Sequence, residues 1–183
     1  MEQVRTFYSR ILKPGAAILD LMSSHDSHLP PDFVDSEITG LGLNKTELAA
    51  NAMLTDHVVH DLNSSPLLPF DDNCFDAVIC TVSIEYLTQP YEIMIQVARV
   101  LRPGGLCAIA VSNRWFPGKQ IQPWSHLHPF ERQGMVLGFL IRSGLFKNLQ
   151  TESIRGLSRP IDDKHYRTTQ LSDPLFFIWG MTK

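Results

Sequence analysis

The stretch Arg99-Val100-Leu101-Arg102-Pro103-Gly104-Gly105 most constrains how this chain can fold. Apolar residues within and before it recur at helical spacing and so share one buried face: Ile93, Met94, Val97, Val100 and Leu101. After it, Leu106–Val111 is an unbroken apolar run, which suits a strand buried on both faces. The predicted helix thus ends on basic residues, Pro-Gly-Gly stops it, and a buried strand follows at once. This pattern predicts half of a βαβ unit.

The composition is that of an ordinary globular protein, and we expect residues 1–183 to form a single domain. Hydrophobic residues make up 44% of the 183 positions and charged residues 19%, which excludes a largely disordered chain. The formal net charge is -3, whereas domains that hold nucleic acid by electrostatics usually carry a basic stripe. We therefore expect no nucleic-acid footprint.

The cysteines and the apolar runs indicate a reducing compartment without a membrane span. Cys74, Cys80 and Cys107 lack metal-like spacing, and two of them lie in strand-like runs, as buried reduced thiols do. The apolar run Met135–Ile141 is too short to cross a bilayer. Because the first residues carry no signal-peptide core, we predict a cytoplasmic protein, with a processed plastid form as the alternative if the source is eukaryotic.

Short apolar runs bounded by turn residues alternate with helical patterns along the chain. Strands are expected at Ala16–Leu21, Glu37–Gly42, His57–Asp61, Phe75–Val82, Leu106–Val111, Leu149–Ile154 and Leu175–Met181. Helices are expected at Val4–Leu12, from an Asn44 cap to Leu54, from Pro90 onward, and at Phe130–Arg142 with Gly144 as its stop. This order predicts a three-layer α/β domain with a mostly parallel sheet.

Several separate motifs, in order, resemble the class I S-adenosylmethionine-dependent methyltransferases of the methyltransferase type 11-like kind. They are Asp61-Leu62, Leu68-Pro69-Phe70, Cys74–Val78 and Arg99–Gly105, and the resemblance runs from about Ala17 to Gly144. It is closest to the branch with quinone-ring methyltransferases. A mostly uncharacterised subgroup is similar at Asp20-Leu21-Met22-Ser23-Ser24. The resemblance implies a Rossmann-like fold whose seven-stranded sheet has an antiparallel last strand, S-adenosylmethionine as cofactor and a small-molecule methyl acceptor.

The chain departs from this family where the cofactor is usually held. Met22, Ser24 and Asp26 stand where the family has loop glycines, and Gly42 stands where it has the acid that takes the ribose hydroxyls. Pro30 and Pro31 also predict a very short or lost first helix. Ser23, Ser24 and Asn44 are candidate replacements, and Asp61 matches the acid that accepts from the adenine amino group. The cofactor residues implied are Asp20, Met22, Ser23, Ser24, Gly42, Leu43, Asn44, Asp61, Leu62 and Ser83.

Residues after the fourth and fifth predicted strands are candidate substrate contacts, because open α/β sheets bind ligands at the carboxyl ends of their strands. They are Tyr86, Asn113, Arg114 and Trp124. The alternatives are a solvated helix start for Tyr86 and an aromatic cover over a sheet edge for Trp124. No general base is assigned, because Glu85, Tyr86 and His28 are all possible. Asp20 either orders the altered loop or caps a simple turn.

Three pairs of closely spaced histidines do not predict a metal site, because no cysteine or further acid completes a ligand set for any of them. The pairs are His25 with His28, His57 with His60, and His126 with His128. The first functional hypothesis is methyl transfer from S-adenosylmethionine. The alternative is a non-catalytic, methyltransferase-like binding or regulatory protein that has lost the cofactor site. A nicotinamide-dependent oxidoreductase is disfavoured, because no Gly-x-Gly-x-x-Gly follows the first strand.

Overall fold

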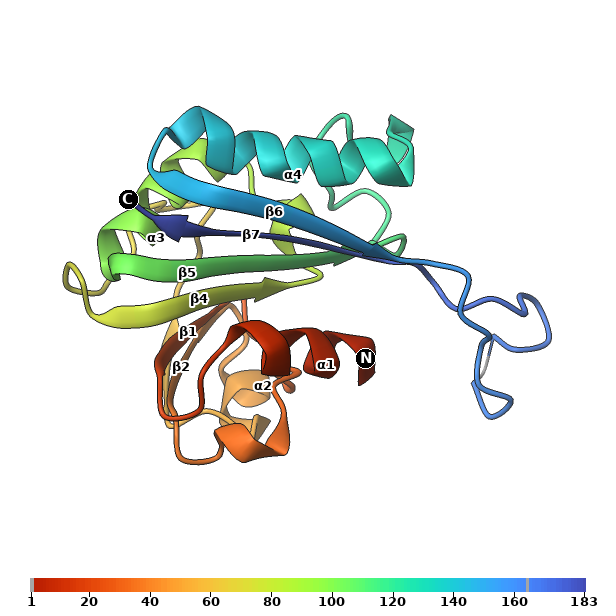
Figure 1. Cartoon of the computed structure of the whole chain (residues 1–183), viewed down its shortest axis with the longest axis horizontal. Helices are drawn as coiled ribbons and strands as arrows, with labels where there is room; N and C mark the ends of the chain where they lie inside the picture. The colour runs from red at the N-terminus through yellow and green to blue at the C-terminus, as the bar shows by residue number, and fades with distance from the viewer. Residues whose placement is uncertain (1, 164) are drawn as a thin grey trace.

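A computed structural model describes residues 2–163 and 165–183 and contains a seven-stranded sheet (Figure 1). The strand order is β3-β2-β1-β4-β5-β7-β6. The strands are β1 (Ala17–Leu21), β2 (Glu37–Gly42), β3 (Asp56–Val59), β4 (Phe75–Thr81), β5 (Leu101–Ser112), β6 (Phe146–Ile154) and β7 (Leu175–Thr182). All neighbouring strands are parallel except β7, which runs antiparallel to both β5 and β6. The predicted mostly parallel sheet with an antiparallel last strand is confirmed.

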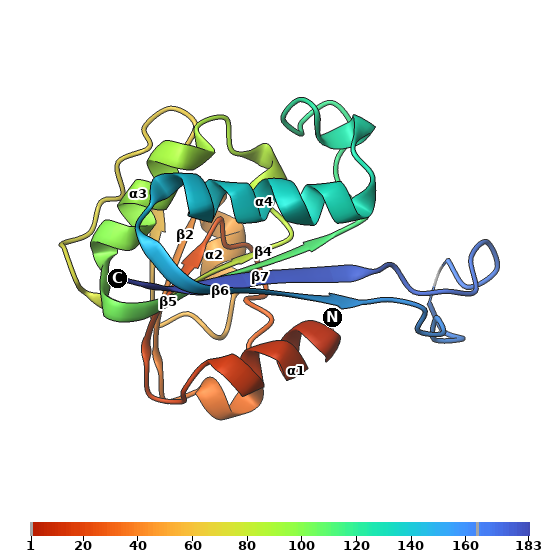
Figure 2. The same ribbon diagram turned by 45° about the horizontal axis from the view of Figure 1, so that its top comes forward.

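Helices cover both faces of this sheet and make two apolar cores (Figure 2). The helices are α1 (Glu2–Ile11), α2 (Lys45–Ala50), α3 (Pro90–Val100) and α4 (Pro129–Ser143). On one face α3 and α4 pack against the sheet through residues such as Val97 and Phe139, whereas α1 buries Phe7 and Tyr8 on the other. The three layers follow from strands that are apolar on both sides and helices with one apolar face.

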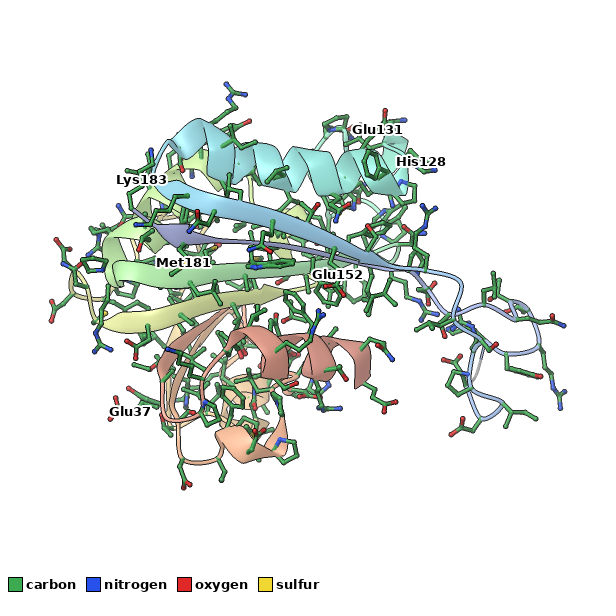
Figure 3. All side chains as sticks on the ribbon, in the orientation of Figure 1. Glu37, His128, Glu131, Glu152, Met181 and Lys183 are labelled. Carbon is green, nitrogen blue, oxygen red and sulfur yellow. The ribbon has the colours of Figure 1, made fainter. Side chains whose placement is uncertain are left out.

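Local sequence signals set both ends of α4, and of these the stop at Gly144 was predicted. α4 begins where the His128 side chain accepts from the Phe130 N–H and the Glu131 carboxylate accepts from the His128 N–H at 2.7 Å (Figure 3). It ends at Gly144, whose φ of 70° is left-handed. No helix among residues 2–163 and 165–183 is both long and apolar enough to cross a membrane.

The Arg-Pro-Gly-Gly stretch ends α3 at Val100, but the predicted start of the next strand at Leu106 is wrong. β5 already begins at Leu101, which pairs with Phe75, and the next pair joins Ala77 to Leu106. Residues 102–105 therefore form a bulge inside β5, in which Gly104 has a φ of 74°. An Arg102–Asp76 ion pair lies across the bulge.

The crossover between β1 and β2 contains no α-helix among its described residues, and the predicted loss of this first helix is confirmed. Its one helical turn is η1 (Pro31–Phe33), a 3-10 helix that starts at a proline. Phe33 is fully buried beside Ile38 of β2. One aromatic side chain thus covers part of the sheet face that a longer crossover helix would cover.

Three predicted boundaries are too long. α2 ends at Ala50 rather than Leu54, because the Asn51 side chain turns away from the helix and donates to Ser24 O and Ser27 Oγ. β3 ends at Val59 rather than Asp61, and β4 ends at Thr81 rather than Val82. In all three cases the residues beyond the observed end belong to a loop and no longer to the helix or strand.

Candidate functional site

The loop after β1 keeps a tight left-handed turn without a glycine. Met22 has a φ of 59°, a conformation that glycine adopts at much lower cost than other residues. The next residue rejoins the sheet, because the Ser23 N–H donates to Leu41 O at 2.8 Å. Met22, which the resemblance places at a glycine position, thus has a backbone conformation that glycine favours.

Asp20, at the end of β1, orders this loop through a hydrogen bond. Its carboxylate is 2% exposed and accepts from the Ser23 hydroxyl at 2.6 Å. Burial raises the pKa of Asp20 to about 6, while hydrogen bonds from Ser23 and Ser27 act in the opposite direction. Of the two roles considered for Asp20, this geometry supports the one in which it orders the loop.

Gly42, at the end of β2, has no room for a side chain. A Cβ on Gly42 would come within 2.3 Å of Ser23 O. The loop backbone after β1 thus lies where an acid at position 42 would begin. The missing glycines and the missing acid are therefore parts of one rearrangement.

Glu47 of α2 supplies a carboxylate beside this loop. Its Oε2 accepts from the Ser24 hydroxyl at 2.6 Å, and its Oε1 accepts from Asn44 Nδ2 at 2.8 Å. Asn44 Oδ1 accepts from the Thr46 and Glu47 N–H groups as the helix cap, so both ends of the Asn44 amide are occupied. Glu47 is not among the site residues predicted from the sequence, because its contact with Ser24 depends on the tertiary fold.

The end of β3 presents an exposed acid next to an exposed apolar side chain. Asp61 accepts from the Asn63 N–H and the Ser64 hydroxyl, and these hydrogen bonds hold its pKa below the ordinary value. The His60 N–H donates to Gly42 O at 3.0 Å, so this turn lies beside Leu43, which is 67% exposed. Leu62 is buried beneath the turn.

The end of β4 is strained. Val82 has a φ of 46°, which is uncommon for a β-branched residue and costs conformational energy. Its N–H still donates to Ala110 O at 2.7 Å. The following Ser83 hydroxyl donates to Thr81 O at 3.2 Å and lies 3.3 Å from Cys80 Sγ. The strain turns the chain sharply at the carboxyl edge, between β1 and β5.

A cavity of about 1140 Å³ lies at this edge, between the ends of β4 and β5 and the loop that joins β6 to β7. Three of the candidate substrate residues line it, namely Tyr86, Asn113 and Arg114. Arg114 also joins this loop to β5 through a 2.7 Å ion pair with Asp173. Trp115 and Phe116 add aromatic surface to the cavity wall.

Trp124 is placed apart from these three residues. It is fully buried in η3 (Trp124–His126), and its carbonyl accepts from Arg132 Nε at 2.9 Å. The Arg132 guanidinium lies 4.2 Å from the centre of the Trp115 ring. Trp124 therefore supports the segment behind the cavity wall and is not among the residues that line the cavity.

The histidines do not converge on a metal site. His28 Nδ1 lies 2.9 Å from Asp26 Oδ2, and burial lowers the pKa of His28. Arg5 of α1 pairs with the same carboxylate at 2.9 Å. Within the described parts of the chain, no group of three His, Cys, Asp or Glu side chains is arranged to hold a metal ion.

A model of the methyltransferase domain family matches residues 25–109, a segment that begins just after the altered loop. This segment is similar to the methyltransferase domain family, and the strand order is that of the class I methyltransferase fold. The match thus covers β2 to β5, whereas Met22, Ser23 and Ser24 lie outside it.

Two curated relatives are similar to part of the chain. The 27-O-demethylrifamycin SV methyltransferase of Amycolatopsis mediterranei is 31% identical over 81 residues, which are 41% of this chain and 30% of the relative. The UbiE ubiquinone/menaquinone biosynthesis C-methyltransferase of Roseobacter denitrificans is 41% identical over 64 residues, 35% of this chain and 24% of the relative. The matched segments thus span less than a third of either relative.

Solved methyltransferase structures share the fold across nearly the whole chain. Phosphoethanolamine N-methyltransferase 2 of Haemonchus contortus, solved in complex with S-adenosyl-L-methionine, superimposes with a TM-score of 0.65 at 15% identity. The superposition covers 98% of this chain and 52% of that one. The likeness concerns the class I methyltransferase fold.

Proposed function

We propose that this chain binds S-adenosylmethionine at the carboxyl edge of β1, β2 and β3 and transfers its methyl group to a small-molecule acceptor. The left-handed turn at Met22 is the observation that carries this proposal. A chain that had abandoned the ligand would have no need to hold a bulky residue in a conformation that costs about 1–2 kcal/mol. The acceptor site is the cavity that Tyr86, Asn113 and Arg114 line.

The residues present fit the cofactor in a rearranged form. Leu43 offers exposed apolar surface for the adenine ring, and the Asp61 carboxylate faces solvent beside it, ready to accept from the adenine amino group. Since position 42 has no room for an acid, Glu47 and Ser24 would take the ribose hydroxyls. The Ser23–Ser24 segment, ordered by Asp20, would face the methionyl end.

When bound, this cofactor supplies an already activated methyl group on a sulfonium. The chain's own work is therefore to align the acceptor and exclude water. Trp115 and Phe116 form walls of the cavity that exclude water. The Arg114–Asp173 ion pair holds in place the loop between β6 and β7, which forms a further wall.

Isothermal titration calorimetry with S-adenosylmethionine and S-adenosylhomocysteine tests this function. We expect binding to the wild type and weakened binding to Asp61→Ala and Glu47→Gln. Glu92→Gln, an exposed acid on α3, is the matched control with unchanged affinity. If neither compound gives a heat of binding or raises the melting temperature at millimolar concentration, a non-catalytic methyltransferase-like protein is the correct description.

A further inference from the structure

Glu85 is a buried carboxylate, and one of its two oxygens has no hydrogen-bond partner among the described residues. It lies in η2 (Ile84–Tyr86), just past β4, and is 1% exposed. Within the described chain, its Oε2 has no hydrogen-bond partner. Burying a carboxylate without partners is costly, so such a group calls for an explanation beyond stability.

The titratable groups that face Glu85 come from three elements. Arg132 approaches from α4, Tyr86 from the same 3-10 turn, and the Cys80 thiol from β4. Arg132 forms no ion pair with Glu85 in the described structure, because its guanidinium lies against Trp115 and donates to Trp124 O. Burial raises the pKa of Glu85 to about 7, opposed by hydrogen bonding from Tyr86 and by the charge of Arg132.

Tyr86 connects this buried carboxylate to the acceptor cavity. Its ring lines the cavity and lies 6.2 Å from the ring of Phe116, centre to centre. Its hydroxyl accepts from the Phe116 N–H at 2.9 Å, which leaves the phenolic proton available to a second partner such as the neighbouring Glu85. The backbone fixes this arrangement, because the Ile121 N–H donates to Glu85 O at 2.8 Å.

We propose that Tyr86 and Glu85 form a proton relay for a methyl acceptor that carries a phenol or enol hydroxyl. This inference rests on the proposed function and names its acceptor class. The aromatic walls at Tyr86, Trp115 and Phe116 suit a flat ring, and the relay suits an acceptor that must lose a proton. Tyr86 is the group that meets the acceptor, and Glu85 acts through it as a positioning residue and final proton acceptor.

Atoms and charge balance in the methyl transfer. The acceptor oxygen forms a bond to the methyl carbon while the carbon–sulfur bond breaks, and the bonding pair stays on sulfur as a neutral thioether. The acceptor's proton moves to the Tyr86 oxygen, and the former Tyr86 proton moves to Glu85. The sulfonium charge and the Glu85 charge are both removed, and no further reactant is required.

The relay is tested first without cofactor or acceptor, by infrared spectroscopy of protein labelled with ¹³C-carboxyl glutamate. The wild type should show a protonated-carboxyl band that is lost with a midpoint near pH 7, as the raised pKa of Glu85 requires. The band should be absent from Glu85→Gln and unchanged in Glu92→Gln. Tyr86→Phe should move the midpoint to higher pH, because it removes a donor to the carboxylate. A midpoint that Tyr86→Phe leaves unchanged overturns the relay.

The second test compares methyl transfer to catechol, which must lose a proton, with transfer to iodide, which has none. Glu85→Gln and Tyr86→Phe should slow transfer to catechol by about 100-fold or more and leave transfer to iodide nearly unchanged. An equal loss with both probes indicates a structural role and overturns the relay. Transfer to iodide alone by the wild type overturns the acceptor class. Failure of the proposed function itself would show separately, as absent binding of S-adenosylhomocysteine in calorimetry.

Discussion

The carbonyl oxygen of Ser23 lies directly against Gly42, so that a Cβ on Gly42 would come within 2.3 Å of it. This contact joins the two places where the chain departs from the family that it resembles. It explains why an acid cannot return to the end of β2 unless the loop after β1 also changes its path.

Gly42→Asp, which restores the family's acid, should therefore destabilise the protein and bind cofactor no better. Overpacking against a backbone atom costs typically about 1–3 kcal/mol, and the surrounding ladder resists a shift. Chemical denaturation measures the loss, with Gly134→Asp on the exposed side of α4, where no neighbouring atom lies within 4 Å of a Cβ, as a comparison for the substitution itself. A variant as stable as the wild type with tighter cofactor binding would contradict the rearranged site.

Met22→Gly should be more stable than Met22→Ala by roughly 1 kcal/mol. Both variants lose the Met22 side chain, which packs partly against the core, so their difference reports the cost of the left-handed backbone less the entropy that glycine adds to the unfolded chain. Urea unfolding of the two variants measures it. Equal stability would mean that the turn at position 22 is not left-handed in solution.

Asp20→Asn should remove a pH dependence of stability. Because the folded pKa is raised from 3.8 to about 6, the folded state holds this proton more tightly, and wild-type stability falls as the pH rises from about 4 to about 6. The stability difference between wild type and Asp20→Asn should change by roughly 3 kcal/mol across that window. Denaturation of both proteins at pH 4 and pH 7 measures this difference. The titration of Glu85 does not contribute to it, because both proteins carry Glu85. A difference that is constant with pH would contradict a buried, protonatable Asp20.

Arg114→Gln should loosen the loop between β6 and β7 with little effect on global stability. The Arg114–Asp173 pair is partly exposed, and such pairs contribute about 0–1 kcal/mol. Limited proteolysis should cut residues 155–174 faster in this variant than in the wild type. Arg102→Gln, at the opposite end of β5, removes a comparable exposed pair and should leave the loop's cleavage rate unchanged.

Most of the fold could be predicted from local sequence signals. β2 was predicted at its observed bounds, α2 from its Asn44 cap, α3 from apolar spacing and a proline start, and α4 from its apolar residues and a Gly144 stop, all of which act within a few residues. The bulge at residues 102–105 was missed because its pairing with β4 depends on a strand 26 residues away, as the Arg102–Asp76 contact shows.

The site was less predictable, because its key contacts join distant segments. The sequence named Asp20, Ser23 and Asn44, but the Glu47–Ser24 contact spans 23 residues and appears only when α2 folds against the loop. The position of Glu85 likewise depends on a distant segment, because the Ile121 N–H donates to its carbonyl oxygen. Sequence spacing can predict which residues lie at the edge of the sheet. Only the fold shows which of their polar atoms already have a hydrogen-bond partner.

The Asn51 amide, which holds Ser24 O and Ser27 Oγ, has a kinetic consequence for any ligand that meets this loop. Together with Glu47, it fixes the segment before a ligand arrives, so little conformational entropy remains to be lost there on binding. Association should then proceed in a single phase without a slow ordering step, and weaker variants of this loop should differ from the wild type mainly in how fast the ligand leaves.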